Sequence, residues 1–218
     1  KGADVIKVYA DYRWGPNKES MPTFSTEEMR LMVETAASSG RDVVAHASTA
    51  EGMRRATMAG VKTIEHGTEG SLEVFQLMRE NNVAFCPTLA ATHSITMYRS
   101  DWDGSKNTEP QVIKEKRAMF ETALQSGVTI IAGGDVGVFE HGQNALELQL
   151  MVDYGMNPIA VLKSVTAVNA QVFGLQNLGQ IKKGFLADVI AVPGNPITDI
   201  SVLYAPSLVI KDGQLIKN

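Results

Sequence analysis

Two patterns of hydrophobic and polar residues alternate along the chain as far as about residue 176. Short apolar runs are separated by longer segments in which apolar residues recur every three or four positions. The short runs predict buried strands and the longer segments predict amphipathic helices. The predicted strands are Ala3–Val8, Asp42–Ala47, Val61–His66, Val83–Cys86 and Val128–Ala132.

Helix start and stop signals follow most of these strands. Ser25 with Glu28 three residues later forms a capping box, and Thr49 and Ser71 are predicted N-caps of the next two helices. A further helix begins at Pro110, and two more are expected at residues 143–154 and 158–173. Residues 88–109 are polar and irregular in pattern, so they predict a loop insert, which could act as a lid.

The alternation of strands and helices predicts an α/β fold with a parallel sheet and right-handed crossovers. Five strand–helix units fit either an open doubly wound sheet or part of a (β/α)8 barrel. After residue 177 the pattern changes to short strands at Leu178–Ile181, Ala187–Val192 and Leu208–Ile216, the last interrupted by the hairpin pair Asp212-Gly213. We therefore expect an α/β domain at residues 1–176 and a small β domain at residues 177–218.

Charge and composition limit the kinds of partner that the chain is expected to bind. The 218 residues carry a net charge of -4 and no Lys/Arg run, so we expect no nucleic-acid partner. No apolar run is long enough to predict a membrane span. A single cysteine, Cys86, excludes an intrachain disulfide. The chain begins at Lys1, in a segment that resembles a helix running into a strand, and we expect it to be the C-terminal part of something longer; localisation is left open.

Polar residues, among them the metal-ligand types His and Asp, lie at the ends of the predicted strands. Lys7, His46 and His66 lie at or near the ends of the first three strands, and Asp135 follows the fifth. In parallel α/β folds, functional residues gather at the carboxyl ends of the strands. Taken singly, such a His is more often a hydrogen-bonded core residue, such a Lys an edge residue and such an Asp a turn residue. Together they favour a shared metal centre, because burying each group alone would cost several kcal/mol.

The same order of Lys, His, His and Asp resembles that of the amidohydrolase superfamily. The segments IEHGT, GGDVG, HGQNALELQLMV, SVTAVNAQVFGL, LGQIKKGFLADVIAVPGNPITDI and VIKDGQLI resemble its imidazolonepropionase-like and Xaa-Pro or Xaa-Arg dipeptidase branch. The resemblance covers essentially the whole chain. It implies a (β/α)8 TIM barrel whose strands four to eight are present here, plus the C-terminal part of a small β-sandwich. The His-x-His pair of the family's first strand does not occur in this sequence.

The resemblance also implies the roles of these residues. Lys7 matches the lysine whose carbamate bridges two divalent metals, and His46 and His66 match ligands of one metal. Zinc is expected, with manganese, iron or cobalt as alternatives. Asp135 matches the last-strand carboxylate, which binds a metal and transfers the proton during hydrolysis by metal-activated hydroxide.

Substrate contacts are expected from His141, Tyr9 and Arg13. His141 matches a His-Gly position of the family near the substrate, although it could instead cap the following helix. Tyr9 lies two residues beyond Lys7 on the same face of its strand. Glu65 is expected to point away from the ligands, because alternate residues of a strand face opposite sides.

The resemblance implies a metal-dependent hydrolase that cleaves the C–N bond of a dipeptide or N-acyl amino acid. Such an enzyme requires the upstream His-x-His segment, supplied on the same chain or by a second chain. The alternative is a non-catalytic fragment or binding module with an incomplete metal site. Strands at both open edges of the sheet would aggregate if left bare, so a partner segment or a homo-oligomer is expected.

Overall fold

The structure is a computed structural model that describes residues 2–217. The chain forms two compact units. The first contains the residues up to 87 together with residues 110–130, and the second contains residues 88–109 together with those from 131 onward. Each unit thus combines separate stretches of the chain, and the expected domain boundary at residue 176 stays a prediction.

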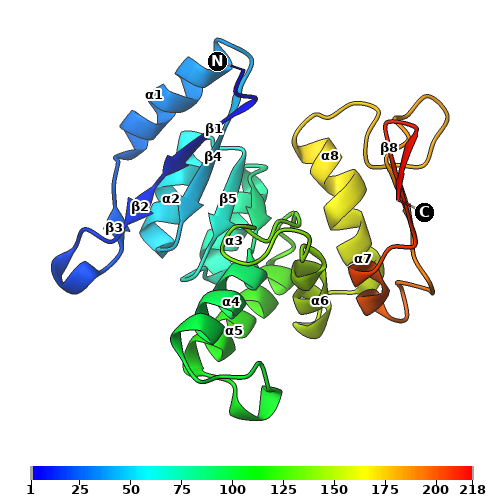
Figure 1. Ribbon diagram of the computed structural model, residues 1–218. Helices are drawn as coiled ribbons and strands as arrows, with labels where there is room; N and C mark the ends of the chain where they lie inside the picture. Colours follow the sequence, from blue (N-terminus) through cyan, green and yellow to red (C-terminus); the bar gives the residue numbers. More distant parts are fainter. Residues whose placement is uncertain (1, 218) are drawn as a thin grey trace. The chain divides into compact units, whose positions relative to one another are not determined.

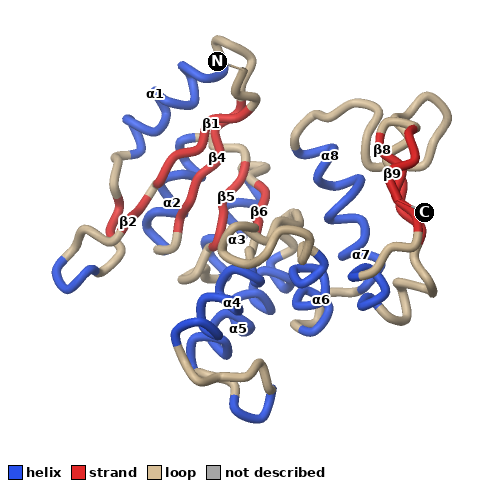
Figure 2. Tube along the Cα trace, in the orientation of Figure 1, coloured by secondary structure: helices blue, strands red, loops and turns tan. Residues whose placement is uncertain are grey.

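A parallel sheet forms the centre of the first unit (Figure 1). Its strands lie in the order β1 (Val5–Tyr9), β4 (Asp42–Ala47), β5 (Thr63–His66) and β6 (Ala84–Cys86), as Figure 2 shows. The predicted fifth strand at Val128–Ala132 is reduced to one parallel bridge between Ile130 and Phe85. The parallel sheet predicted from the sequence is therefore confirmed, with a shorter final strand.

Four helices pack beside one another against this sheet. They are α1 (Thr26–Ala37), α2 (Ala50–Ala59), α3 (Leu72–Glu80) and α5 (Gln111–Ser126). Because the order of the strands follows the order of the chain, right-handed crossovers place these helices on the same side of the sheet (Figure 1). The apolar layer between helices and sheet includes Phe75 and Phe85, whose ring centroids are 4.9 Å apart, and the fully buried Ile64.

Local capping explains where three of these helices begin. Ser25 accepts a hydrogen bond from the Glu28 amide while the Glu28 carboxylate accepts one from the Ser25 amide, which completes the predicted capping box. Thr49 and Ser71 cap α2 and α3 through their hydroxyl groups, as predicted.

A small hairpin of β2 (Asp11–Tyr12) and β3 (Met21–Pro22), with the short 3-10 turn η1 (Pro16–Lys18), occupies the loop after β1.

The second unit contains helices and a small antiparallel sheet. Its helices are α4 (Leu89–Arg99), α6 (Ala145–Asp153) and α7 (Pro158–Lys163), the last continuing through a π-helical turn (Ser164–Val168) into α8 (Asn169–Val172); η2 (Lys106–Thr108) and η4 (Ile200–Tyr204) are 3-10 turns. The sheet order is β7 (Val189–Ala191), β8 (Leu208–Lys211) and β9 (Gln214–Lys217). Asp212 and Gly213 both have positive φ between β8 and β9, which confirms the predicted hairpin.

Two sequence predictions are wrong in the second unit. The segment at 88–109 is not an irregular insert, because α4 occupies its first half with Leu89, Ala90 and Ala91 buried. No strand forms at Leu178–Ile181, where Ile181 is 92% exposed. Among the residues that the structure describes, no helix is long and apolar enough to cross a membrane.

Candidate metal and active site

The edge strand β1 carries two of the predicted site residues on one face. Lys7 and Tyr9 are two positions apart, so they share that face. Tyr9 lies beside His46 in the register between β1 and β4, and the two rings stack with centroids 4.5 Å apart and 24° between their planes. Lys7, Tyr9 and His46 therefore lie together at the carboxyl end of the sheet.

His66 extends this group from the next strand. Its ring centroid lies 4.5 Å from that of His46, with the two planes at 63°. The backbone of His66 is left-handed, with a φ of 75°, and this turns the ring out of the regular alternation of β5. Gly67 follows at a φ of 58°, and a Cβ there would lie 2.5 Å from the Phe85 ring, so the close packing behind His66 requires glycine.

The prediction that Glu65 points away from the ligands is wrong. The register between β4 and β5 pairs Glu65 with His46, and paired residues of neighbouring strands share a face. The Thr63 hydroxyl, two positions earlier on that face, donates a hydrogen bond to the Glu65 carboxylate. Strand alternation failed as a guide because it does not continue through the left-handed residue His66.

Asp11 is a buried acid of the site that the sequence analysis missed. Its carboxylate is fully buried and accepts hydrogen bonds from the amides of Ser48 and Thr49 at 2.9 and 2.7 Å, and from the Thr49 hydroxyl at 2.8 Å. Asp11 Oδ1 also lies 3.8 Å from His46 Nε2. The acid thus fixes the turn that follows His46 and lies beside its ring. An aspartate shortly after a strand was the one available sequence signal, and it is a weak one.

Burial, together with the nearby positive charges of His46, Lys116 and Lys7, lowers the pKa of His66 to about 3. His66 is therefore neutral at neutral pH, and a neutral imidazole is the form in which histidine binds a metal. Two adjacent imidazoles beside a lysine suit a divalent transition metal. No three His, Cys, Asp or Glu side chains within residues 2–217 are arranged to hold a metal ion. The donors fit part of a metal centre, and further ligands would have to complete it.

The remaining predicted residues belong to the second unit or to the loop after β2. Asp135 and His141 belong to the second unit, where both are exposed; Asp135 has a φ of 59° in the turn after the bridge at Ile130. Arg13 is exposed in the loop between β2 and β3 of the first unit. The structure thus brings together Lys7, Tyr9, His46 and His66.

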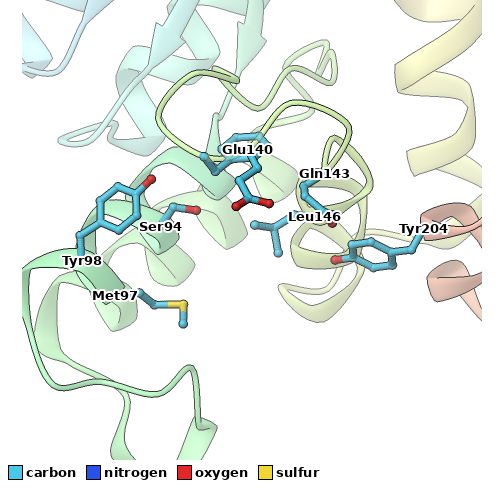
Figure 3. A pocket seen from close by; sticks show the side chains of 8 residues that line it. Ser94, Met97, Tyr98, Glu140, Gln143, Leu146 and Tyr204 are labelled. Atoms are coloured by element: carbon cyan, nitrogen blue, oxygen red, sulfur yellow. The ribbon is translucent and has the colours of Figure 1, made fainter.

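A pocket of about 460 Å³ lies within the second unit (Figure 3). The Tyr98 hydroxyl donates a hydrogen bond to the Val138 carbonyl at its edge. Glu140, next to His141 in the chain, contributes a carboxylate to the lining. The lining residues are Ser94, Met97, Tyr98, Phe139, Glu140, Gln143, Leu146 and Tyr204.

Comparison with known proteins identifies the class. The sequence model of the amidohydrolase family matches residues 1–216. The chain belongs to this family, which confirms the resemblance inferred from the strand-end residues.

Three individual relatives show how similar this chain is to known proteins and how much of each it covers. An ochratoxinase from Aspergillus niger is 33% identical over 231 residues, which cover 100% of this chain and 47% of that protein. The structure of a Xaa-Pro dipeptidase with methionine bound in its active site has a TM-score of 0.87 and 38% identity, covering 100% of this chain and 55% of the other. A prolidase in complex with N-methylphosphonate-L-proline has a TM-score of 0.83 and 28% identity, with coverage of 100% and 55%. The chain therefore spans about half the length of the relatives that it matches.

Proposed function

We propose that the protein carrying this chain is a metal-dependent hydrolase that cleaves the C–N bond of a dipeptide or N-acyl amino acid. The observation that carries the proposal is the pair of imidazoles, His46 and His66, with ring centroids 4.5 Å apart beside β1, the strand that carries Lys7. Membership of the amidohydrolase family supports action on an amide bond. The similarity to a Xaa-Pro dipeptidase and a prolidase favours a peptide substrate.

The proposal includes a (β/α)8 barrel in which the strands of this chain are strands four to eight, with a small β-sandwich that includes β7–β9. An upstream segment with a His-x-His pair would complete both the barrel and the metal centre. The position of β1 at the edge of the parallel sheet supports this arrangement, because another strand could add to it, and its residues Val5 and Ile6 are each 37% exposed. A chain about half as long as its relatives also supports it.

The proposed centre contains two divalent metals, with zinc the expected ion and manganese, iron or cobalt as alternatives. His46 and His66 would bind one metal through ring nitrogens, Lys7 would bridge both as a carbamate, and Asp135 would bind the other. When bound, such ions lower the pKa of a water molecule and polarise the carbonyl group of an amide.

The protein side chains have separate tasks in this proposal. Asp135 accepts the proton of the attacking water and delivers it to the leaving amine. Tyr9 stacks on His46 and so limits the orientation of that ring. Tyr9, Arg13 and His141 would contact the substrate, with Arg13 binding a carboxylate through charge-assisted hydrogen bonds.

A second candidate is a non-catalytic fragment or binding module with an incomplete metal site. One observation favours it: within residues 2–217, no three His, Cys, Asp or Glu side chains converge on one point. The two candidates differ in whether further ligands, from an upstream segment or a second chain, complete the centre.

The test is the substitution Asp135→Asn in the full-length protein. We expect the metal to be largely retained, because the Asn amide oxygen can still bind it, and turnover of Xaa-Pro dipeptides to fall by about 100-fold or more, because the amide cannot accept the proton. Asp101→Asn, at an exposed position of the same unit, is the matched control and should keep activity. Near-normal hydrolysis by the Asp135 variant would remove Asp135 from the mechanism.

A further inference from the structure

His66 has an unusual backbone for a residue with a side chain. Its φ of 75° lies in the left-handed region, which is disfavoured for residues with a Cβ. This conformation brings the ring to 4.5 Å from that of His46. Contacts around residue 66 must hold the backbone in this conformation. One of them is the hydrogen bond from the Gly67 amide to the Ala47 carbonyl at 2.9 Å.

Lys116 supplies a second contact from helix α5. Its Nζ donates a hydrogen bond of 2.6 Å to the carbonyl oxygen of His66. Lys116 is only 2% exposed and lies on the face of α5 that otherwise buries Ile113, Met119 and Phe120. A buried ammonium group is costly unless it is hydrogen-bonded, so an apolar residue would serve packing alone at lower cost.

We infer that Lys116 is a positioning residue: its ammonium group holds the His66 carbonyl, fixes the left-handed turn at the end of β5, and so aims the imidazole at the His46 side of the metal centre. The inference rests on the proposed function for the role of His66 as a metal ligand. Groups that orient metal ligands from behind typically change metal affinity by about 10- to 100-fold when they are removed. The competing explanation is that Lys116 only stabilises the packing of α5 on the sheet.

The test compares metal affinity in the full-length protein, by chelator competition at a temperature where each variant is folded. Lys116→Met keeps most of the side-chain length but removes the donor, and we expect metal affinity to fall by about 10- to 100-fold. Lys114→Met makes the same change at an exposed position of α5 and should leave affinity within about 2-fold of the wild type. Lys116→Gln retains a neutral N–H donor and should restore part of the affinity.

A purely packing role predicts a different result. A folded Lys116→Met variant with a lowered unfolding temperature but unchanged metal affinity would overturn the inference. Failure of the proposed function can be told apart from failure of this inference. If the proposed function were wrong, the wild-type protein itself would hold no metal at this site.

A crystal structure of the wild-type protein decides the geometry independently of the variants. We expect Lys116 Nζ within hydrogen-bonding distance of the His66 carbonyl oxygen and a positive φ at His66. A separation beyond about 4 Å would overturn the inference even if the substitutions prevent folding.

Discussion

Replacing Asp11 by alanine should destabilise the first unit more than any ordinary surface substitution. The carboxylate accepts hydrogen bonds from two backbone amides and the Thr49 hydroxyl at the start of α2. A hydrogen bond to a charged group contributes about 1.5–3 kcal/mol, and a buried donor left without a partner costs about 1–3 kcal/mol. Water that enters the space left by the missing carboxylate would satisfy some of these donors. We therefore expect Asp11→Ala to lower the free energy of unfolding by about 3–5 kcal/mol.

Asp11→Asn separates the charge from the shape of the side chain. Its amide oxygen can still accept hydrogen bonds, but the negative charge at the N-terminus of α2 is lost, so we expect a smaller loss of about 1–3 kcal/mol. Asp42→Ala is the matched control, since that carboxylate is 45% exposed and lies 4.0 Å from Lys62. Removing such a surface pair should change stability by no more than about 1 kcal/mol.

Urea denaturation of the full-length protein, followed by circular dichroism, measures all three variants. We expect the order Asp11→Ala, Asp11→Asn, Asp42→Ala from the most to the least destabilised variant. If Asp11→Ala and Asp42→Ala unfold within about 1 kcal/mol of each other, Asp11 does not hold the turn after His46.

Three further predictions test other parts of the structure. A Cβ at Gly52 would lie 2.3 Å from Asp11 Oδ2, so Gly52→Ala should lower stability to urea by about 1–3 kcal/mol, although alanine is the better helix former; a gain in stability would contradict this. Buried Glu147 accepts hydrogen bonds from the first two amides of α4, at 3.0 and 2.7 Å, so Glu147→Ala should cost about 2–4 kcal/mol and speed hydrogen exchange in α4; unchanged exchange would refute the role. Because the pKa of His66 is lowered to about 3 from an ordinary 6.5, the unfolded chain binds a proton first as pH falls. The metal-free protein should therefore lose about 2 kcal/mol from this residue between pH 7 and pH 5, and His66→Asn should lose less; equal losses in the two proteins would count against burial of His66.

Elements with local signals could be predicted from the sequence. The capping box at Ser25 and Glu28 depends on residues three positions apart, and the hairpin at Asp212-Gly213 depends on two adjacent residues. Helix α4 has no such signal, because it begins after Thr88 in a left-handed conformation without a side-chain cap. Its first amides are bonded by Glu147, more than fifty residues further along the chain.

In the candidate site too, some residues could be predicted from the sequence and others could not. Lys7, His46 and His66 could be found because parallel strands bring their carboxyl ends to one edge of the sheet, and the structure places these strands side by side. Asp11 and Lys116 act through partners 37 and 50 residues away, and no spacing rule connects such pairs. The face of Glu65 was mispredicted because the conformation of one residue, His66, departs from a regular strand.

Metal content tests most directly whether the protein holds the proposed two-metal centre at Lys7, His46 and His66. Elemental analysis of the full-length protein after exhaustive dialysis should find about two divalent ions per chain, and the double variant His46→Ala/His66→Ala should lose at least one of them. A wild-type protein with less than about one ion per chain, or a double variant that keeps its full content, would contradict the account.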